Sequence, residues 1–242
     1  MSNIFSMIVY EPIYNLLIFI YNWLPVQDFG IAIIITTVIL KLFLIPLSKK
    51  QIESQKKLQE IQPKIKEIQQ KYKNDKENQS KELMEFYKKN KTNPFSGCLP
   101  LVVQIIFLFA IYRILFNISN AGLMVQDGVL YSFVAKPEHI NQFFLGFIDM
   151  AKPNIFFAVL AAAAQFVQTK MLMKTQKKDE KEKKEKPAGE PDFSQIMNKQ
   201  MLYLGPALTL FIGMKFAAGL SLYWLVSTLF MIFQQMYLTK KK

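Results

Sequence analysis

The chain has 242 residues, a hydrophobic fraction of 51% and a formal net charge of +12. This length is enough for one sizeable domain. An apolar composition with 21 phenylalanines, in which the charges are confined to a few blocks, argues against an ordinary soluble globule. A single cysteine and a single histidine exclude an internal disulfide and a zinc site built from clustered Cys and His ligands.

The N-terminal segment 4–24 is apolar but interrupted by Glu11 and Pro12, among other residues. Its clean part, 13–24, reaches only ~18 Å as a helix, whereas a bilayer hydrocarbon core is ~30 Å thick. We therefore interpret residues 1–27 as an amphipathic helix that lies in the membrane interface on the outer side. The alternative is a true membrane span.

The first membrane span is predicted at 28–48. Residues 29–47 are almost wholly apolar, with Lys41 their only charge, and nineteen helical residues reach ~28 Å. Four further spans are predicted at 94–117, 154–173 and, as a pair joined by a very short connection at 215–217, 196–238. The fold class is therefore an all-α membrane protein with five transmembrane helices.

The segment 49–93 is rich in Lys, Glu and Gln and is not a span. One apolar stripe runs along its first half with spacings of four, three and four residues: Ile61, Ile65, Ile68 and Tyr72. A turn follows at 73–76, so the pattern predicts a helical hairpin in the cytoplasm, whose first arm is kinked or restarted by Pro63. A solvated charged loop is the alternative.

The segment 174–195 differs from the first charged segment. Lys, Asp and Glu are mixed in it without an apolar stripe, and Pro187, Gly189 and Pro191 follow. A sequence of this composition cannot bury a core, so we expect a flexible, charged cytoplasmic loop.

The placement of lysines indicates the topology. Residues 1–40 contain no Lys or Arg, whereas 49–93 contain thirteen Lys and 170–199 contain nine. The expected outer loop, 118–153, holds only two Lys, and the tail 239–242 is basic. The positive-inside rule then places the N-terminus outside and the C-terminus in the cytoplasm. Because topology accounts for most of the basic excess, nucleic-acid binding is not needed to explain it.

Lys41 is the most informative single residue. It lies about twelve residues into the first span, where a lysine costs roughly 2.5 to 3.5 kcal/mol on insertion scales. Such residues normally face a protein interior or a water-filled cavity, and Thr37 lies one turn earlier on the same face. In the alternative, the four-carbon side chain of Lys41 extends to the cytoplasmic interface.

Polar residues also occur in the other predicted spans. Each alone is more often an interhelical hydrogen-bonding group than a functional one. Together with Lys41 and Thr37 they could line one wet cavity: Gln104, Gln165, Ser221, Trp224 and Ser227. The sequence contains no Gly-rich phosphate loop, no HExxH motif and no nucleophile with a plausible base, so we expect no enzyme activity and no cofactor or metal.

Three stretches carry a resemblance to a known family: GIAIIITTVILKLFLIP at 30–46, NPFSGCLPLVVQ at 93–104 and FAAGLSLYW at 216–224. With them, the chain from Phe29 onward resembles the YidC-type membrane protein insertases, which have mitochondrial and chloroplast relatives. The resemblance implies five helices around a hydrophilic groove that is open to the cytoplasm and to lipid and closed on the outer side.

The resemblance also implies roles for individual residues. The groove cation of the family, normally arginine, aligns with Lys41, which keeps the charge but not the bidentate guanidinium. Positions that contact substrate align with Thr37, Leu108 and Trp224. Many relatives carry a proline where this chain has Ile106.

The partners implied by the family are nascent membrane proteins, the lipid bilayer, the ribosome and the signal-recognition-particle receptor, with the Sec translocon as a further candidate. The implied location is the plasma membrane of a bacterium. Two other functions stay open: a small transporter or channel with Lys41 as an anion site, and an assembly factor that binds membrane subunits without inserting them.

Overall fold

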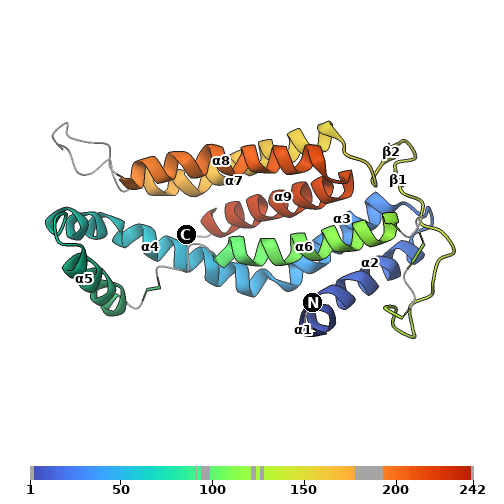
Figure 1. The fold of residues 1–242 in the computed structure, drawn as a ribbon, viewed down its shortest axis with the longest axis horizontal. Helices are drawn as coiled ribbons and strands as arrows, with labels where there is room; N and C mark the ends of the chain where they lie inside the picture. The colour runs from blue at the N-terminus through green and yellow to red at the C-terminus, as the bar shows by residue number, and fades with distance from the viewer. Residues whose placement is uncertain are drawn as a thin grey trace. The chain divides into compact units, whose positions relative to one another are not determined.

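The computed structural model describes residues 3–90, 92–93, 99–120, 124–125, 128–177 and 193–240, most of which are helical. The helical elements are α1 (Asn3–Phe5), the π-helical turn η1 (Ser6–Tyr10), α2 (Glu11–Trp23), α3 (Phe29–Phe43), α4 (Ile45–Lys71), α5 (Lys76–Lys89), α6 (Leu99–Asn120), α7 (Ile155–Lys177), α8 (Phe193–Lys215) and α9 (Ala218–Lys240) (Figure 1). Two short strands, β1 (Phe143–Phe144) and β2 (Ile148–Asp149), complete the fold.

The chain divides into two compact units. A core unit comprises residues 1–43, 105–172 and 188–242, and a hairpin unit comprises 44–104 and 173–187. Most of the charged loop expected at 174–195 lies outside the described residues, because 178–192 are not among them.

The N-terminal elements form one continuous helical run, since the backbone stays in the right-handed helical region at both junctions of η1. One face packs into the core through Ile13, Leu17 and Ile20. The opposite face exposes Phe19 and Trp23, so both faces are apolar rather than one apolar and one polar. The assignment of 1–27 to an amphipathic helix in the membrane interface stays a prediction.

Two sets of hydrogen bonds hold this helical run in the core unit. The Asn117 side-chain amide of α6 donates to the Tyr10 hydroxyl at 2.9 Å, and the Arg113 guanidinium lies 5.2 Å from the centre of the Tyr10 ring. Asn15 donates to the Val129 carbonyl at 2.9 Å and accepts from the Tyr131 amide at 2.6 Å. These contacts connect three segments that are far apart in the sequence.

The expected continuous helix at 28–48 is broken at Leu44, where α3 has ended and α4 begins. Pro46, in the first turn of α4, supplies the reason. Proline has no N–H to bond the carbonyl four residues earlier, and its ring clashes with that carbonyl.

Within the described residues, two segments are long and apolar enough to cross a membrane, Val102–Asn120 and Ile155–Leu172. Phe29–Phe43 and Ile45–Ser54 together form a third, broken candidate. Leu202–Lys215 is a shorter apolar helix. The structure thus supports a membrane protein with two or three candidate spans, and the five-span count stays a prediction.

In the hairpin unit, α4 and α5 pack against each other as a helical hairpin. The turn between them ends at Asp75, whose carboxylate accepts hydrogen bonds from the Asn78 backbone amide at 3.1 Å and its side-chain amide at 2.6 Å. These bonds hold the pKa of the Asp75 carboxyl below its usual value. Gln79 connects the arms by donating to the Gln69 carbonyl at 2.7 Å. α4 continues through Pro63, so no new helix starts there.

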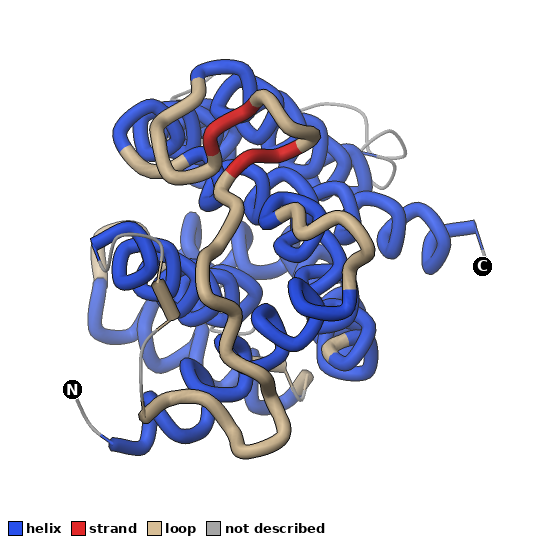
Figure 2. The backbone as a smooth tube through the Cα atoms, turned by 90° about the vertical axis from the view of Figure 1, so that its right-hand side faces the viewer, coloured by secondary structure: helices blue, strands red, loops and turns tan. Residues whose placement is uncertain are grey.

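The long loop after α6 folds back over the beginnings of α3 and α9. β1 and β2 pair antiparallel, with Phe143 opposite Asp149 and Phe144 opposite Ile148 (Figure 2). The first turn of α9 donates to this loop, from Ala218 to the Lys152 carbonyl at 2.8 Å and from the following amide to the Met150 carbonyl at 3.0 Å. The segment that directly follows the β-hairpin therefore caps the start of α9.

Candidate functional site

Lys41 lies on the buried face of α3. Phe29, Ile33, Thr37 and Lys41 follow one another at intervals of four residues, and all four are buried. Lys41 retains 9% of its accessible surface, so its side chain is not extended into solvent along the surface of the core unit. The Thr37 hydroxyl donates to the Ile33 carbonyl at 2.6 Å. The Thr37 hydroxyl is thus hydrogen-bonded within its own helix, and Thr37 acts on this face of α3 mainly as a small side chain.

α9 is the principal helical neighbour of α3, and Gly219 fixes how they meet. A Cβ at Gly219 would lie 3.1 Å from the Ile33 side chain of α3, so the backbone of α9 approaches closely there. Lys41 and Ser227 each lie eight residues further along their helices, about 12 Å at 1.5 Å per residue. Both helices run away from the same loop, so Lys41 and Ser227 are about equally far along their helices from it. Ser227 is fully buried.

Three polar residues of α9 share one side of the helix. Ser221, Trp224 and Thr228 follow at spacings of three and four residues, which places them on one face. The Trp224 indole N–H donates to the Gln165 side-chain oxygen of α7 at 3.3 Å. Of the predicted site residues, Gln165 and Trp224 are therefore in direct contact.

Three hydroxyls on these helices are buried without a hydrogen-bond partner in the described part of the chain: Thr36, Ser221 and Thr228. Each such group costs roughly 1 to 3 kcal/mol if it stays unsatisfied. Buried hydroxyls of this kind are usually satisfied by water or by a bound group. Their presence on α3 and α9 gives these helices a polar face with unused hydrogen-bonding capacity.

Seven of the eight predicted residues belong to the core unit, and whether they form one site stays a prediction. Six lie on α3, α7 and α9 of the core unit: Thr37, Lys41, Gln165, Ser221, Trp224 and Ser227. Leu108, on α6, is half-buried against the apolar core of the same unit. Gln104 belongs to the hairpin unit, so its place beside the other seven residues stays a prediction.

Thr36 and Asp28 are among the buried polar residues that the sequence reasoning missed. Thr36 lies beside Thr37 on the buried face of α3. Asp28 is buried and caps the same helix, with its Oδ1 accepting from the Ile31 amide at 2.9 Å. An Asp directly before an apolar run is a known helix-start signal and could have identified Asp28. Nothing in the sequence indicates that Thr36 is buried as well as Thr37.

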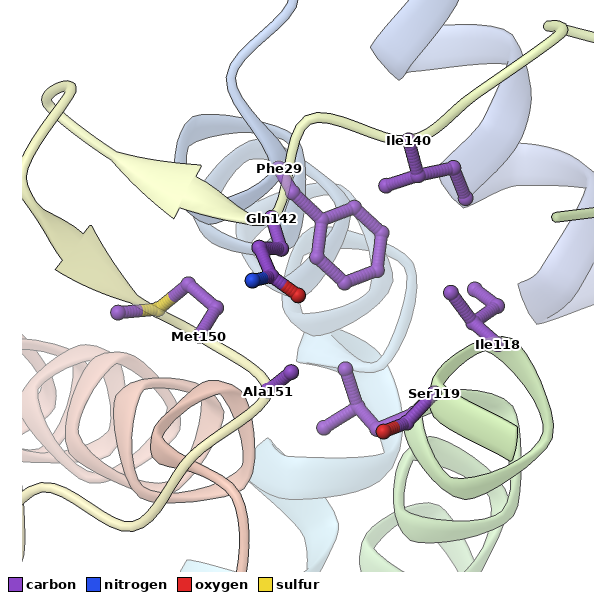
Figure 3. Close-up of a pocket in the computed structure, with 8 residues that line it drawn as sticks. Phe29, Ile118, Ser119, Ile140, Gln142, Met150 and Ala151 are labelled. Carbon is purple, nitrogen blue, oxygen red and sulfur yellow. The ribbon is translucent and has the colours of Figure 1, made fainter. Parts of the chain in front are cut away.

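Two cavities of the core unit lie away from these residues. The first, of about 10 Å³, has room for about one water and is lined by Phe29, Ser119, Gln142 and Met150, among others (Figure 3). The second, of about 210 Å³, lies between α2 and the long loop. None of the eight predicted residues lines either cavity, so the predicted groove stays a prediction. Among the described residues, no group of three or more His, Cys, Asp or Glu side chains could hold a metal ion.

Comparison with known proteins identifies the family. The family model described as 60Kd inner membrane protein matches residues 19–242. A protein of Fusobacterium nucleatum named membrane protein insertase YidC is 33% identical over 237 residues, which cover 96% of this chain and 98% of that protein. Proteins of the same name from Rickettsia typhi and Pelobacter propionicus are 30% and 32% identical over 96% of this chain. The chain spans 39% of the length of these two relatives. It therefore belongs to the YidC-type family of 60Kd inner membrane proteins.

Proposed function

We propose that this protein is an insertase that helps nascent membrane proteins enter the bilayer and fold there. The observation that carries the proposal is the burial of the Lys41 side chain on the otherwise apolar helix α3. A buried cation within an apolar helix is retained at a cost of a few kcal/mol, and such residues mark pathways for polar groups. The relative from Fusobacterium nucleatum, which this chain matches over nearly its whole length, is named an insertase.

In the proposed mechanism, Lys41 attracts acidic or polar groups of the segment that must cross the membrane. The partnerless hydroxyls of Thr36, Ser221 and Thr228 would exchange hydrogen bonds with that segment or with water. A polar surface of this kind lowers the free-energy barrier for moving a short hydrophilic segment into the bilayer. We also propose that this polar surface lines a groove that is open to the cytoplasm.

The driving force in this mechanism comes from the substrate. A transmembrane helix buries about 20 apolar residues in lipid, and this burial is strongly favourable. The substrate helix would leave along the lipid-facing surface, which includes the exposed apolar residues Leu42 and Phe43 of α3. No nucleotide is required, and we propose no enzymatic step.

The same proposal includes a topology and a set of partners. We place the protein in the cytoplasmic membrane of a bacterium, with the N-terminus outside and the C-terminus inside, because the lysine-rich segments then face the cytoplasm. The helical hairpin of α4 and α5 is the basic surface that would meet the ribosome and the targeting receptor. A Sec translocon is a further proposed partner.

Insertion into liposomes that contain only this protein tests the proposal. A small two-span protein is synthesised in the presence of these liposomes, and insertion is measured as the protease-protected fragment. We expect at least ten-fold more protected substrate than with empty liposomes. Substrate bound to the liposomes but still digested would instead indicate an assembly factor. Anion uptake without insertion would indicate a transporter, and either result would overturn the proposal.

A further inference from the structure

The turn of the β-hairpin carries apolar side chains that point away from the core. Phe143, Leu145 and Phe147 are 40%, 58% and 73% exposed. None of the five residues from Phe143 to Phe147 is charged. Exposed apolar residues gathered in this way mark a surface that contacts another apolar phase. We propose that this turn is a lipid anchor, which inserts Leu145 and Phe147 into the boundary between headgroups and acyl chains.

The β-hairpin is fixed to the first turn of α3. Asp28 accepts the hydrogen bond from the Leu145 amide through Oδ2 at 2.6 Å, while its Oδ1 caps α3. The Phe144 ring occupies the position where a side chain on Gly30 would begin. One buried carboxylate and one close ring contact therefore fix the height of the turn relative to the start of the span.

The backbone conformation of the turn indicates that the Leu145 side chain has a role other than forming the turn. Leu145 has a φ of 53° and Gly146 has a φ of 83°. The left-handed region disfavours a branched residue such as leucine, and glycine or asparagine would fit there with less strain. A leucine that is strained and also half exposed gains nothing from the core. Insertion into lipid would give this side chain a favourable environment.

Lipid is the proposed occupant because the β-hairpin adjoins the beginning of a candidate span. The Phe144 ring lies 6.0 Å from the Phe157 ring in the first turn of α7. Ile155 and Phe156, in the same turn, are exposed, and Ile155–Leu172 is long and apolar enough to cross the membrane. The ends of a span lie at the membrane interface, where aromatic residues concentrate. The turn thus continues the lipid-facing surface of α7.

This inference requires that α7 span the bilayer, but it does not depend on insertase activity. The two can therefore fail separately. Its functional consequence is that the depth of α3, and with it the depth of Lys41, is set by an anchor outside the span itself.

Depth measurement with a fluorescent label tests the inference. In a Cys98→Ser background, a single cysteine is introduced as Phe147→Cys and, on the same loop, as the control Lys136→Cys; both native residues are exposed. Each is labelled with NBD and reconstituted in phosphatidylcholine–phosphatidylglycerol vesicles. We expect blue-shifted emission at position 147 and at least three-fold stronger quenching by acyl-chain nitroxides than at position 136. Aqueous emission at both positions would overturn the inference. Blue-shifted emission that nitroxide lipids do not quench would also overturn it, because a protein partner would then cover the turn.

A second variant tests whether Asp28 holds the turn at the membrane interface. Asp28→Asn keeps one side-chain oxygen and can no longer accept at both positions. Asparagine is a favourable helix N-cap, so we expect its oxygen to stay with the Ile31 amide, and the Leu145 amide then loses its acceptor. We expect the quenching at position 147 to fall toward the value at position 136, while the protein remains folded by circular dichroism. Unchanged quenching in Asp28→Asn would show that Asp28 does not hold the turn at the interface.

Discussion

Replacing Lys41 by glutamate is expected to abolish the rescue of bacterial cells that are depleted of their own insertase. Lys41→Arg should rescue them, and Lys41→Ala should rescue them only in part. Two unit charges ~5 Å apart interact by about 3 kcal/mol at an effective dielectric constant near 20, so charge reversal turns a comparable attraction into repulsion. The effect should be largest for substrates with acidic translocated segments, whose insertion we expect to fall about 10- to 100-fold in Lys41→Ala.

A matched control separates this effect from the total charge of the protein. Lys136→Glu makes the same charge change at an exposed position of the long loop after α6 and should rescue nearly as well as the wild type. Substrates with neutral translocated segments should be inserted equally by the wild type and Lys41→Ala. Equal rescue by alanine, arginine and glutamate at position 41, at matched protein levels, would remove Lys41 from the mechanism.

Substitution of Gly213 should cause the largest loss of stability among the glycines of α8. A Cβ there would lie 2.7 Å from the Cβ of Ala158 on α7 and 2.8 Å from the Oγ of Ser221 on α9. The Cα of Ala158 lies 2.9 Å away, so the obstruction includes backbone that cannot rotate aside. Small residues at such crossings let membrane helices approach closely. Overpacking typically costs about 1 to 3 kcal/mol, and we expect Gly213→Val to reach or exceed the upper value.

Gly205, on the same helix, provides the control. A Cβ there meets only the Gln165 amide nitrogen at 3.9 Å, an ordinary van der Waals contact. Gly205→Ala should therefore be neutral or stabilising, by up to about 1 kcal/mol, because alanine favours a helix over glycine. Thermal unfolding in detergent, followed by tryptophan fluorescence, measures both variants. Equal melting temperatures for Gly213→Val and Gly205→Ala would contradict the close packing of α7, α8 and α9.

The sequence predicts the helices well where apolar runs are long and uninterrupted. The third span, expected at 154–173, corresponds to α7, and the short connection at 215–217 separates α8 from α9. The break at Leu44 was missed because hydropathy continues through it, although Pro46 carries the signal. The β-hairpin could not be predicted, since strands of two residues depend on tertiary contacts such as the Phe144 ring against Gly30.

In the candidate site, too, some features follow from the sequence and others depend on tertiary contacts. Lys41 is buried, as one of the two interpretations of its place within an apolar helix predicted, but the sequence alone did not exclude a side chain that extends to the interface. The contact between Gln165 and Trp224 also needs the rotation of α7 and α9 about their axes, which no local pattern specifies. The Thr37 hydroxyl donates to a backbone carbonyl of its own helix. Any helical threonine can make this hydrogen bond, so the sequence does not tell whether the hydroxyl bonds within the helix or faces a cavity.

Access of water to Lys41 is the most direct test of the proposed mechanism. In a Cys98→Ser background, Lys41→Cys is compared with Leu42→Cys, the next residue, whose native side chain is exposed on the apolar surface. Inverted membrane vesicles are treated from the cytoplasmic side with a maleimide that cannot cross the bilayer. The mechanism predicts labelling at position 41 at least ten-fold faster than at position 42, because only a hydrated thiol ionises and reacts. No labelling at position 41, or equal rates at the two positions, would contradict a polar path from the cytoplasm to this residue.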